Sequence, residues 1–365
     1  KLLALWPNAP AGVNSAGLKR RDTINKIVFA GIASIAKCWA DFGFVNLVII
    51  DEAHLVSPND ETMYRRVLEG LKSVNPHLKV IGLTATPWRL GQGRITLDGI
   101  FTDICFDITG LAAFNRLIAE GYLAPVVPKR TQTLLDTEGV HMRGGEFIQA
   151  ELQNAVDKSE ISYAAVKEAM EIGYDRKHWL IFCAGVEHAI HVSDMLNSFG
   201  ISCLPIHSKL SPAERDDAIR KFKSGEVRAL TNNNVLTTGF DMPGIDLILM
   251  LRPTQSPVLW VQMLGRGTRP CEGKENCLVL DFAGNTRRLG PINDPVIPKK
   301  KGSKTGEAPI KLCECCGTYN HASARFCGGE AFPTVQGCGH EFKIMTKLKQ
   351  SASTEDLIKG DAPVV

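Results

Sequence analysis

Three features that would narrow the function at once are missing from the sequence. No apolar run approaches the roughly 18 residues that a membrane-spanning helix needs, so we expect no membrane partner. There is no excess of one charge sign, because 42 Lys and Arg stand against 39 Asp and Glu. Any basic surface for nucleic acid must therefore be local. There is also no internal repeat of solenoid length.

The eleven cysteines lack the regular spacing of a disulfide framework. Six are scattered, several inside apolar runs, which is typical of a reduced, cytoplasmic protein. The other five crowd into one short segment, which indicates a metal site. The scattered cysteines are Cys38, Cys105, Cys183, Cys203, Cys271 and Cys277, and the crowded ones are Cys313, Cys315, Cys316, Cys327 and Cys338. Three histidines without partners at metal-ligand spacing are expected at the surface: His178, His188 and His191.

Short apolar runs that alternate with helix-period segments are abundant. These runs show no two-residue alternation, which is typical of parallel strands covered on both faces. One intervening helix is marked by a capping box that starts at Ser211, with Pro212 at its first position and Gly225 at its end. The pattern predicts an α/β, doubly wound architecture. The predicted strands are 45–50, 79–83, 179–183, 228–231, 246–251 and 276–280.

The predicted strands fall into two groups separated by a polar stretch, which indicates two α/β domains in tandem. The stretch is expected to carry one helix, over 147–156. A proline- and lysine-rich segment after the second group has the composition of a solvated linker. The expected units are a first domain (1–128), a linker (129–157), a second domain (158–288), a basic linker (289–309), a cysteine-rich module (310–345) and a disordered tail (346–365).

Two carboxylates stand directly after the strand predicted at 45–50, in Asp51-Glu52-Ala53-His54. Open α/β sheets bind their ligands at this edge. Asp51 can hold Mg²⁺ through water, while Glu52 orients and deprotonates an attacking water molecule. The alternative is a solvated strand end, where Asp and Glu are common.

Two threonine-containing segments follow other predicted strands. Thr84 and Thr86 offer hydroxyls beside the carboxylates, although this segment alone is an ordinary strand-to-loop turn. Thr237 and Thr238 could contact a nucleic-acid phosphate, and Gly239 permits close backbone approach. The second segment also has the pattern of a turn.

A predicted helix that starts at Ser256 and Pro257 places Gln262, Arg266 and Arg269 at i, i+4 and i+7, on one face. Two guanidiniums aimed together have the fork geometry for a triphosphate, and stabilising its transition state is the arginine-finger role. The alternative is an exposed basic helix face.

The cysteine cluster begins with Cys313-x-x-Cys316-Gly317, which has the spacing of a zinc knuckle. Its second half is less regular, because residues 329–337 separate Cys327 from Cys338. We expect a small zinc ribbon in which four thiolates hold Zn²⁺ and stabilise a segment with few apolar residues. The alternative is free thiols in a disordered tail. The expected ligands are Cys313, Cys316, Cys327 and Cys338, with Cys315, His321 and His340 as alternates.

In this order, over about residues 12–288, the motifs resemble the superfamily 2 helicases of the DEAD/DEAH class. Residues 86–91 and 236–241 resemble those of RadD-like and restriction-type (Res subunit) motors in particular. The resemblance implies two RecA-like domains, ATP in the cleft between them and DNA crossing both. The matched segments are 51–54 (motif II), 84–86 (motif III), 237–241 (motif V) and 262–269 (motif VI).

The resemblance also implies a role for each motif. The carboxylates supply the Mg²⁺ partner and the general base, the arginines are fingers from the opposite domain, and the threonines couple hydrolysis to domain motion. His54 and Gln262 would link the catalytic edge to motif VI. The implied residues are, for catalysis, Asp51, Glu52, His54, Gln262, Arg266 and Arg269; for coupling, Thr84 and Thr86; for nucleotide binding, Gly239 and Asp241; and for nucleic-acid binding, Lys19, Arg20, Ser34, His207, Thr237 and Thr238.

The family's phosphate loop, G-x-x-x-x-G-K-[ST], has no match in residues 1–50. Gly302-Ser303-Lys304-Thr305 lies in the basic linker, without a preceding strand or a following helix. The family's glutamine before Ser34 is replaced by Ala33. We therefore expect a chain truncated before the phosphate loop, which alone binds ATP poorly.

The sequence as a whole predicts an ATP-dependent DNA helicase or translocase. By resemblance, it would act in DNA repair or recombination, on single-stranded or branched DNA, with single-stranded-DNA-binding or recombination proteins as partners. Two alternatives stay open. One is the translocase subunit of a restriction system, although the chain shows no nuclease constellation. The other is a non-catalytic nucleic-acid-binding module, which the missing phosphate loop would allow.

Overall fold

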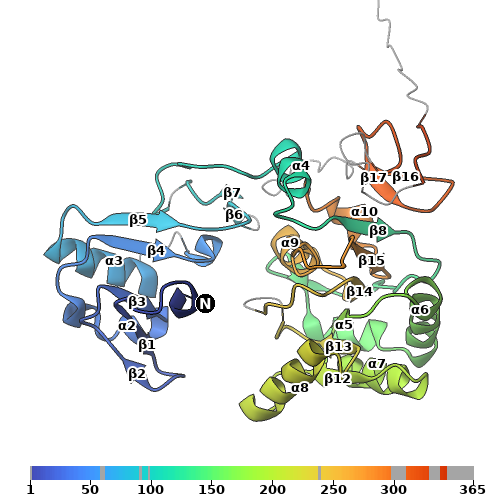
Figure 1. Ribbon diagram of the computed structural model, residues 1–365, viewed down its shortest axis with the longest axis horizontal. Helices are drawn as coiled ribbons and strands as arrows, with labels where there is room; N and C mark the ends of the chain where they lie inside the picture. The colour runs from blue at the N-terminus through green and yellow to red at the C-terminus, as the bar shows by residue number, and fades with distance from the viewer. Residues whose placement is uncertain are drawn as a thin grey trace, which may run out of the picture.

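The computed structural model shows two α/β lobes and a small cysteine-rich module (Figure 1). We call residues 2–110 the N-terminal lobe and residues 111–296 the C-terminal lobe. Within the described part of the chain, no helix is both long and apolar enough to cross a membrane. The described residues are 2–57, 62–89, 93–97, 99–236, 240–296, 310–328 and 338–342.

A six-stranded parallel sheet forms the centre of the C-terminal lobe, in the order β12-β13-β11-β14-β15-β8. Every residue of β11, β13, β14 and β15 is buried, which confirms the expected parallel strands covered on both faces. The strands are β8 (Val126–Lys129), β11 (Trp179–Cys183), β12 (Cys203–Ile206), β13 (Ala229–Asn232), β14 (Leu247–Leu251) and β15 (Cys277–Asp281).

Helices cover both faces of this sheet. One core cluster packs α5, α6 and α7 against the sheet, and a second packs α8, α9 and α10 against the opposite face. The architecture is therefore doubly wound, as the sequence predicted. The helices are α5 (Gln149–Val156), α6 (Ser159–Ile172), α7 (Val186–Ser198), α8 (Pro212–Ser224), α9 (Pro257–Leu264) and α10 (Asn285–Leu289).

The helix signals in the sequence act as predicted. The Ser211 hydroxyl accepts from the Glu214 amide at 3.3 Å, and the Glu214 carboxylate accepts from the Ser211 amide at 2.8 Å. Gly225 ends α8 with a φ of 78°, and Gly200 follows α7 with a φ of 81°. These left-handed conformations favour glycine, so the chain leaves each helix without strain.

The first domain boundary differs from the prediction at one strand. Residues 126–128, which the sequence interpretation placed in the first domain, belong to β8, which pairs in parallel with β15. The linker expected at 129–157 also packs on this lobe, because Leu135, Leu152 and Val156 are buried in its core. The strand is short and contains Pro128. Proline within a sheet is confined to edge strands, so the sequence signal for this strand is weak.

The N-terminal lobe contains several small sheets. β1 lies between β2 and β3, while β4 and β5 pair in parallel with Ile50 opposite Gly82. Helix α3 packs Val67, Leu68 and Leu71 into the core beneath β4. The elements are α1 (Leu2–Leu5), β1 (Ala11–Ser15), β2 (Arg20–Arg21), β3 (Ile27–Ala30), α2 (Ile32–Ile35), η1 (Trp39–Phe42), β4 (Leu47–Ile50), η2 (Ala53–Leu55), α3 (Met63–Val74), β5 (Lys79–Gly82), β6 (Trp88–Arg89) and β7 (Gly93–Arg94).

The described residues cover only one face of the β4–β5 pair. On the other face Leu47, Ile49 and Ile81 are 45%, 57% and 39% exposed. The sequence predicted both strands, but their burial on both faces is wrong for this part of the structure. Such an exposed apolar group is uncommon, because parallel strands are normally buried on both sides.

Three smaller features complete the C-terminal half. Helix α4 (Leu111–Ala119) leads from the N-terminal lobe towards β8, and β9 (Met142–Arg143) and β10 (Glu146–Phe147) form a hairpin. In the cysteine-rich module, β16 (Ile310–Leu312) pairs with β17 (Tyr319–His321). The module lies against β8, where the Arg130 amide donates to the Gly317 carbonyl at 2.9 Å. Most of the predicted basic linker, at 297–309, and the predicted tail at 346–365 lie outside the described residues.

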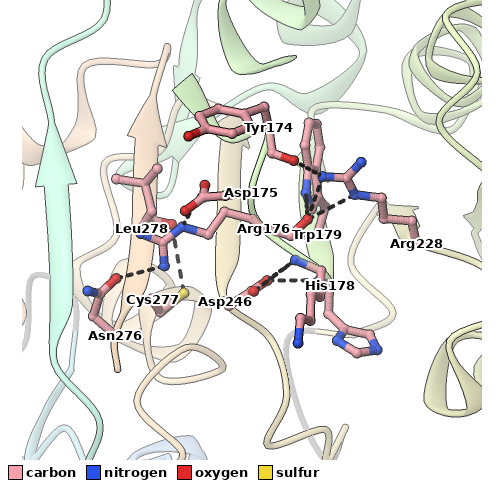
Figure 2. A network of polar contacts seen from close by, with 11 residues as sticks. Tyr174, Asp175, Arg176, His178, Trp179, Arg228, Asp246, Asn276, Cys277 and Leu278 are labelled. Atoms are coloured by element: carbon pink, nitrogen blue, oxygen red, sulfur yellow. Dashed lines mark hydrogen bonds and ion pairs between the residues drawn. The ribbon is translucent and has the colours of Figure 1, made fainter. Parts of the chain in front are cut away.

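A polar network holds the amino ends of the larger sheet together (Figure 2). The Arg228 guanidinium donates to the carbonyls of Tyr174 and Arg176 and lies 5.0 Å from the ring centroid of Trp179. The Asp246 carboxylate accepts from the amide of His178 at 2.8 Å. Since open α/β sheets bind ligands at the opposite, carboxyl ends of their strands, this network serves stability.

Candidate active site

The carboxylate pair follows β4 in an uncommon backbone conformation. Glu52 has φ 50° and ψ 49°, the left-handed region that residues other than glycine rarely adopt. The turn is held by the Asp51 carboxylate, which accepts from the Glu52 amide at 2.9 Å, and by the Ala53 amide, which donates to Leu83 at 2.9 Å. Residues held in such conformations cluster at functional sites, so the geometry supports a functional role for this turn.

His54 connects the carboxylate pair to the two threonines. Its Nδ1 atom lies 2.9 Å from the Thr84 hydroxyl, 3.3 Å from the Thr86 hydroxyl and 3.3 Å from a carboxylate oxygen of Glu52. The Thr86 amide donates to the Thr84 hydroxyl at 3.1 Å. The sequence placed these hydroxyls beside the carboxylates, and the structure brings the two segments into one hydrogen-bonded network.

The two arginines converge, but not as the sequence predicted. Helix α9 ends at Leu264, before both arginines, so the predicted single helical face of Gln262, Arg266 and Arg269 is wrong. Arg266 and Arg269 instead both donate to the Phe240 carbonyl, at 2.6 Å and 3.1 Å. Gln262 does lie within α9, as predicted.

Close packing explains why glycine stands in the turn after this helix. A Cβ atom on Gly267 would lie 2.5 Å from the sulfur of Cys277 in β15, far inside van der Waals contact. Only glycine therefore allows this turn to lie against the strand. The turn brings the Arg269 side chain back to the same carbonyl that Arg266 reaches.

The charges of the two lobes act on one another at Arg266, whose residue is only 8% exposed. Burial lowers the pKa of Arg266 and the Arg269 charge lowers it further, while the Glu52 and Asp241 carboxylates raise it. Glu52 belongs to the N-terminal lobe and Arg266 to the C-terminal lobe. The structure therefore places the predicted base and the predicted arginine finger within electrostatic reach of each other.

Asp241, an expected nucleotide contact, forms an ion pair with Arg269. Thr237, Thr238 and Gly239, the other predicted residues of this segment, lie outside the described residues. Asp241 thus contributes to the arrangement of the arginines within the protein.

The predicted nucleic-acid contacts of the N-terminal lobe lie near one turn. Lys19 has a φ of 52°, and Arg20 forms an ion pair with Asp22 at 2.7 Å. The Ser34 hydroxyl accepts from the Ala16 amide at 3.0 Å, which ties α2 to this turn. Lys19 and Arg20 are both exposed, so they form a local basic surface.

His207, also predicted to contact nucleic acid, is only 7% exposed. Burial lowers its pKa, and its buried Nδ1 atom has no hydrogen-bond partner among the described residues. The structure therefore does not bring the imidazole to the surface with the other predicted nucleic-acid contacts.

The four expected zinc ligands lie together. The sulfur atoms of Cys313, Cys316, Cys327 and Cys338 all lie within 4.8 Å of one another. Two of the separations are 3.6 Å (Cys313 to Cys338) and 3.5 Å (Cys316 to Cys327). Thiolates about 2.3 Å from a tetrahedral zinc ion are about 3.8 Å apart, so this set fits Zn²⁺.

Among the alternates, Cys315 is exposed, and both ring nitrogens of His321 lie within hydrogen-bond distance of other side chains. Its Nδ1 atom is 2.6 Å from the Ser323 hydroxyl, and its Nε2 atom is 3.0 Å from the Asp294 carboxylate. The geometry thus favours the four cysteines over these two alternates.

Two groups at the site were missed by sequence reasoning. The Phe240 carbonyl, which gathers the arginines, has no side-chain signal because any residue offers a carbonyl. Glu146, in the β9–β10 hairpin, accepts from the amides of Gln255 (3.0 Å) and Ser256 (3.2 Å) at the start of α9. An acidic residue after Gly144-Gly145 was the only available signal, and nothing in the sequence linked it to α9.

Two family models match the chain. "Type III restriction enzyme, res subunit" matches residues 7–89, and "Helicase conserved C-terminal domain" matches residues 163–271. The first range contains the carboxylates and threonines, and the second contains the arginines. The matches therefore cover the segments on both sides of the site.

Two fungal relatives are similar over most of the chain. IRC3 of Schizosaccharomyces pombe, assigned as a mitochondrial ATP-dependent helicase, is 34% identical over 69% of this chain and 40% of the relative. IRC3 of Saccharomyces cerevisiae, assigned as an ATP-dependent helicase, is 30% identical over 70% of this chain and 36% of the relative. The chain thus spans less than half the length of either relative.

A solved structure shows the same fold. It is a fragment assigned as the HsdR subunit of a type I restriction enzyme from Vibrio vulnificus, with a TM-score of 0.53 and 21% identity, covering 80% of this chain and 54% of that one. The fold is that of two RecA-like units. The chain belongs to the superfamily 2 helicases of the Res type, as the sequence motifs predicted.

Proposed function

We propose that this chain is the motor core of an ATP-dependent DNA helicase or translocase. The observation that carries the proposal is the electrostatic interaction between Glu52 and Arg266, which belong to different lobes. A hydrolytic base and a transition-state cation supplied from opposite sides are what a motor driven by lobe closure requires.

The residues divide the chemistry of hydrolysis between them. Asp51 would hold Mg²⁺ through water, and Glu52 would orient and deprotonate the attacking water. Arg266 and Arg269 would stabilise the charge that develops on the phosphate oxygens. Bound Mg²⁺ would neutralise phosphate charge during transfer.

The network around His54 provides a route from hydrolysis to motion. Because the Nδ1 atom of His54 lies within contact distance of Glu52, Thr84 and Thr86 at once, a change at the carboxylate alters the contacts of the β5 loop. We infer that this network couples the hydrolytic state to the position of the lobes, as the family resemblance suggested.

The fit to ATP is partial. The residues of the catalytic edge are present, but residues 1–50 contain no phosphate loop to cradle the β- and γ-phosphates. We therefore expect residues 1–365 alone to bind ATP weakly.

For the nucleic acid, we propose single-stranded or branched DNA, with the exposed Lys19 and Arg20 as phosphate contacts and Thr237 and Thr238 as further contacts. A role in DNA repair or recombination, with single-stranded-DNA-binding or recombination proteins as partners, extends the proposal. The absence of disulfides among the eleven cysteines favours a reducing compartment such as the cytoplasm.

We further propose that the cysteine-rich module holds one Zn²⁺ through Cys313, Cys316, Cys327 and Cys338. Their sulfur separations support this proposal. The ion would supply structural stability to a module that contains few buried apolar residues of its own.

The substitution Glu52→Gln tests the proposal in the complete protein that carries these residues. We expect DNA-stimulated ATPase activity to fall at least 100-fold, since removal of a positioned general base costs on the order of 10² to 10⁴. Glu69→Gln, an exposed glutamate on α3, is the matched control and should retain activity. Unchanged activity in Glu52→Gln would exclude Glu52 as the base.

The match to the restriction-enzyme family model favours one second candidate, the translocase subunit of a restriction system. Such a motor acts with a nuclease, so the purified complex from its host would cleave DNA in an ATP-dependent manner. A complex that hydrolyses ATP on DNA without cleavage favours the helicase. A complete protein that binds no nucleotide favours a non-catalytic nucleic-acid-binding module.

A further inference from the structure

Lys274, which no motif includes, has all three donors of its ammonium group in use. Its Nζ atom donates to the carbonyls of Pro243 at 3.0 Å, Gly267 at 2.8 Å and Arg269 at 2.8 Å. A lysine ammonium has three N–H groups and no acceptor, so these bonds saturate it. We call this arrangement the Lys274 clamp.

The clamp joins the two segments that form the arginine site. Pro243 belongs to the loop that begins at Phe240, whose carbonyl receives both guanidiniums. Gly267 and Arg269 belong to the turn that carries them. The loop and the turn are therefore fastened twice, once through the arginine side chains and once through Lys274.

The remaining carbonyl of the turn is also held. The Ala124 amide, in the connection that leads from α4 to β8, donates to the Thr268 carbonyl at 2.6 Å. Three consecutive carbonyls, at Gly267, Thr268 and Arg269, are thus fixed by bonds from outside the turn. The turn follows the end of α9 and is joined to it by the Gly267 amide, which donates to the Leu264 carbonyl at 2.8 Å. The bonds to the three carbonyls fasten the rest of the turn.

Burying the ammonium of Lys274 costs free energy, which its hydrogen bonds to the backbone must offset. Burial lowers the pKa of Lys274, which means that the charged form is less favourable here than in water. Its bonds go to carbonyl oxygens and not to a carboxylate, so its charge is used to hold the backbone. A lysine that served only solubility would extend its ammonium into solvent and not against this turn.

We propose that Lys274 is a positioning residue for hydrolysis, which holds the turn so that Arg266 and Arg269 present their guanidiniums towards the site of Glu52. The proposal rests on the proposed ATPase function. Lys274 lies outside motif VI and would set the arrangement of the two arginines only through backbone carbonyls.

Lys274→Met, which keeps the length of the apolar stem and removes the donors, tests the proposal in the complete protein. We expect kcat for DNA-stimulated ATP hydrolysis to fall about 10- to 100-fold, because misplacement of a catalytic group by about 1 Å can cost 10²-fold. The KM for ATP should change less than about twofold, since the arginines act on the transition state. Lys221→Met, which removes a partly exposed ion pair on α8, is the matched control and should leave both values unchanged.

A double mutant separates positioning from general stability. If Lys274 acts through the arginines, Lys274→Met should lower kcat by a smaller factor in an Arg269→Ala background than in the wild type. An equal factor in both backgrounds, or an unchanged kcat in the single mutant, would overturn the proposal. Should Lys274→Met unfold below the assay temperature, Lys274→Arg takes its place, because it keeps the charge but its planar fork does not reproduce the tripod of donors that an ammonium presents.

Glu52→Gln serves as the reference that separates the two proposals. If Glu52→Gln retains full activity, the proposed function fails, whatever Lys274 does. If Glu52→Gln is inactive while Lys274→Met is fully active, the motor assignment stands and only the positioning role is excluded.

Discussion

The Glu52 carboxylate raises the pKa of the Arg266 guanidinium although the two residues belong to different lobes. This charge interaction joins segments more than 200 positions apart in the sequence. It follows that any change in the relative position of the lobes changes the electrostatic surroundings of both groups. The charge of Arg266 is therefore sensitive to the relative position of the lobes.

Arg266→Ala should abolish most of the ATPase activity of the complete protein. Arginine fingers contribute on the order of 10³ to 10⁵ in kcat, so we expect a fall of at least 10³-fold in steady-state hydrolysis. Arg220→Ala, which removes an exposed arginine paired with Asp217, is the control and should stay within about twofold of the wild type. If Arg266→Ala lowers kcat by less than tenfold, its guanidinium stabilises the structure and not the transition state.

His54→Ala should weaken the stimulation of ATP hydrolysis by DNA more than the basal rate. Removing the imidazole deletes its contacts with Thr84, Thr86 and Glu52 at once, so the β5 loop loses its side-chain link to the carboxylates. Rates measured with and without single-stranded DNA give the ratio directly, and His77→Ala, an exposed histidine of the same lobe, is the control. Equal loss with and without DNA would contradict a coupling role.

Cys313→Ser should remove the bound zinc. A tetrahedral site that loses one thiolate loses most of its affinity, so metal analysis should show a fall from about one zinc per chain to a small fraction. Cys271→Ser alters an exposed cysteine outside the cluster and should keep the full metal content. Full zinc retention in both Cys313→Ser and Cys327→Ser would rule out this ligand set.

Stability should fall between pH 6.5 and pH 4 because of His188. Burial lowers the pKa of His188 to about 4; the charge of Asp157 raises it, and that of His191 lowers it. In this pH window His188 takes up a proton in the unfolded chain but not in the folded protein. The free energy of unfolding therefore falls as the pH falls, by about 3 kcal/mol in total. Below pH 4 this loss levels off.

Thermal unfolding across this pH range checks the assignment to His188. His188→Gln should flatten the dependence, since glutamine does not titrate, while His141→Gln, at an exposed site, should leave it unchanged. The same slope in wild type and His188→Gln would place the acid sensitivity elsewhere.

Ser211→Ala should destabilise the C-terminal lobe by about 1 kcal/mol, because it removes one half of the capping box at α8. Ser224→Ala, near the other end of the same helix, should cost less. Denaturant unfolding of both variants gives the comparison, and equal losses would mean that the cap contributes nothing specific.

Local patterns predicted most of the fold. The apolar runs, the capping box at Ser211 and the glycine stops gave the buried strands and the helix ends, because each depends on neighbours within a few positions. The local pattern did not predict β8, because its four residues, with Pro128 among them, acquire strand character only by pairing with β15. His188 was expected at the surface, yet α7 buries it completely against the sheet.

The site was predictable in composition but not in geometry. Motif spacing identified Glu52, Arg266 and Arg269, whereas a helical projection put the two arginines on one face of a helix that ends before both. What brings them together is the Phe240 carbonyl and, in our proposal, Lys274. Backbone acceptors of this kind leave no trace in the pattern of side chains.

The place of β8 in the larger sheet determines how the molecule can be dissected. A fragment begun at residue 158, where the sequence drew the second domain, would omit an edge strand and leave β15 with open backbone hydrogen-bonding groups. It would also discard the strand against which the cysteine-rich module rests. An autonomous C-terminal fragment should therefore start before Val126, and proteases that cut the folded protein between its halves should do so upstream of that strand.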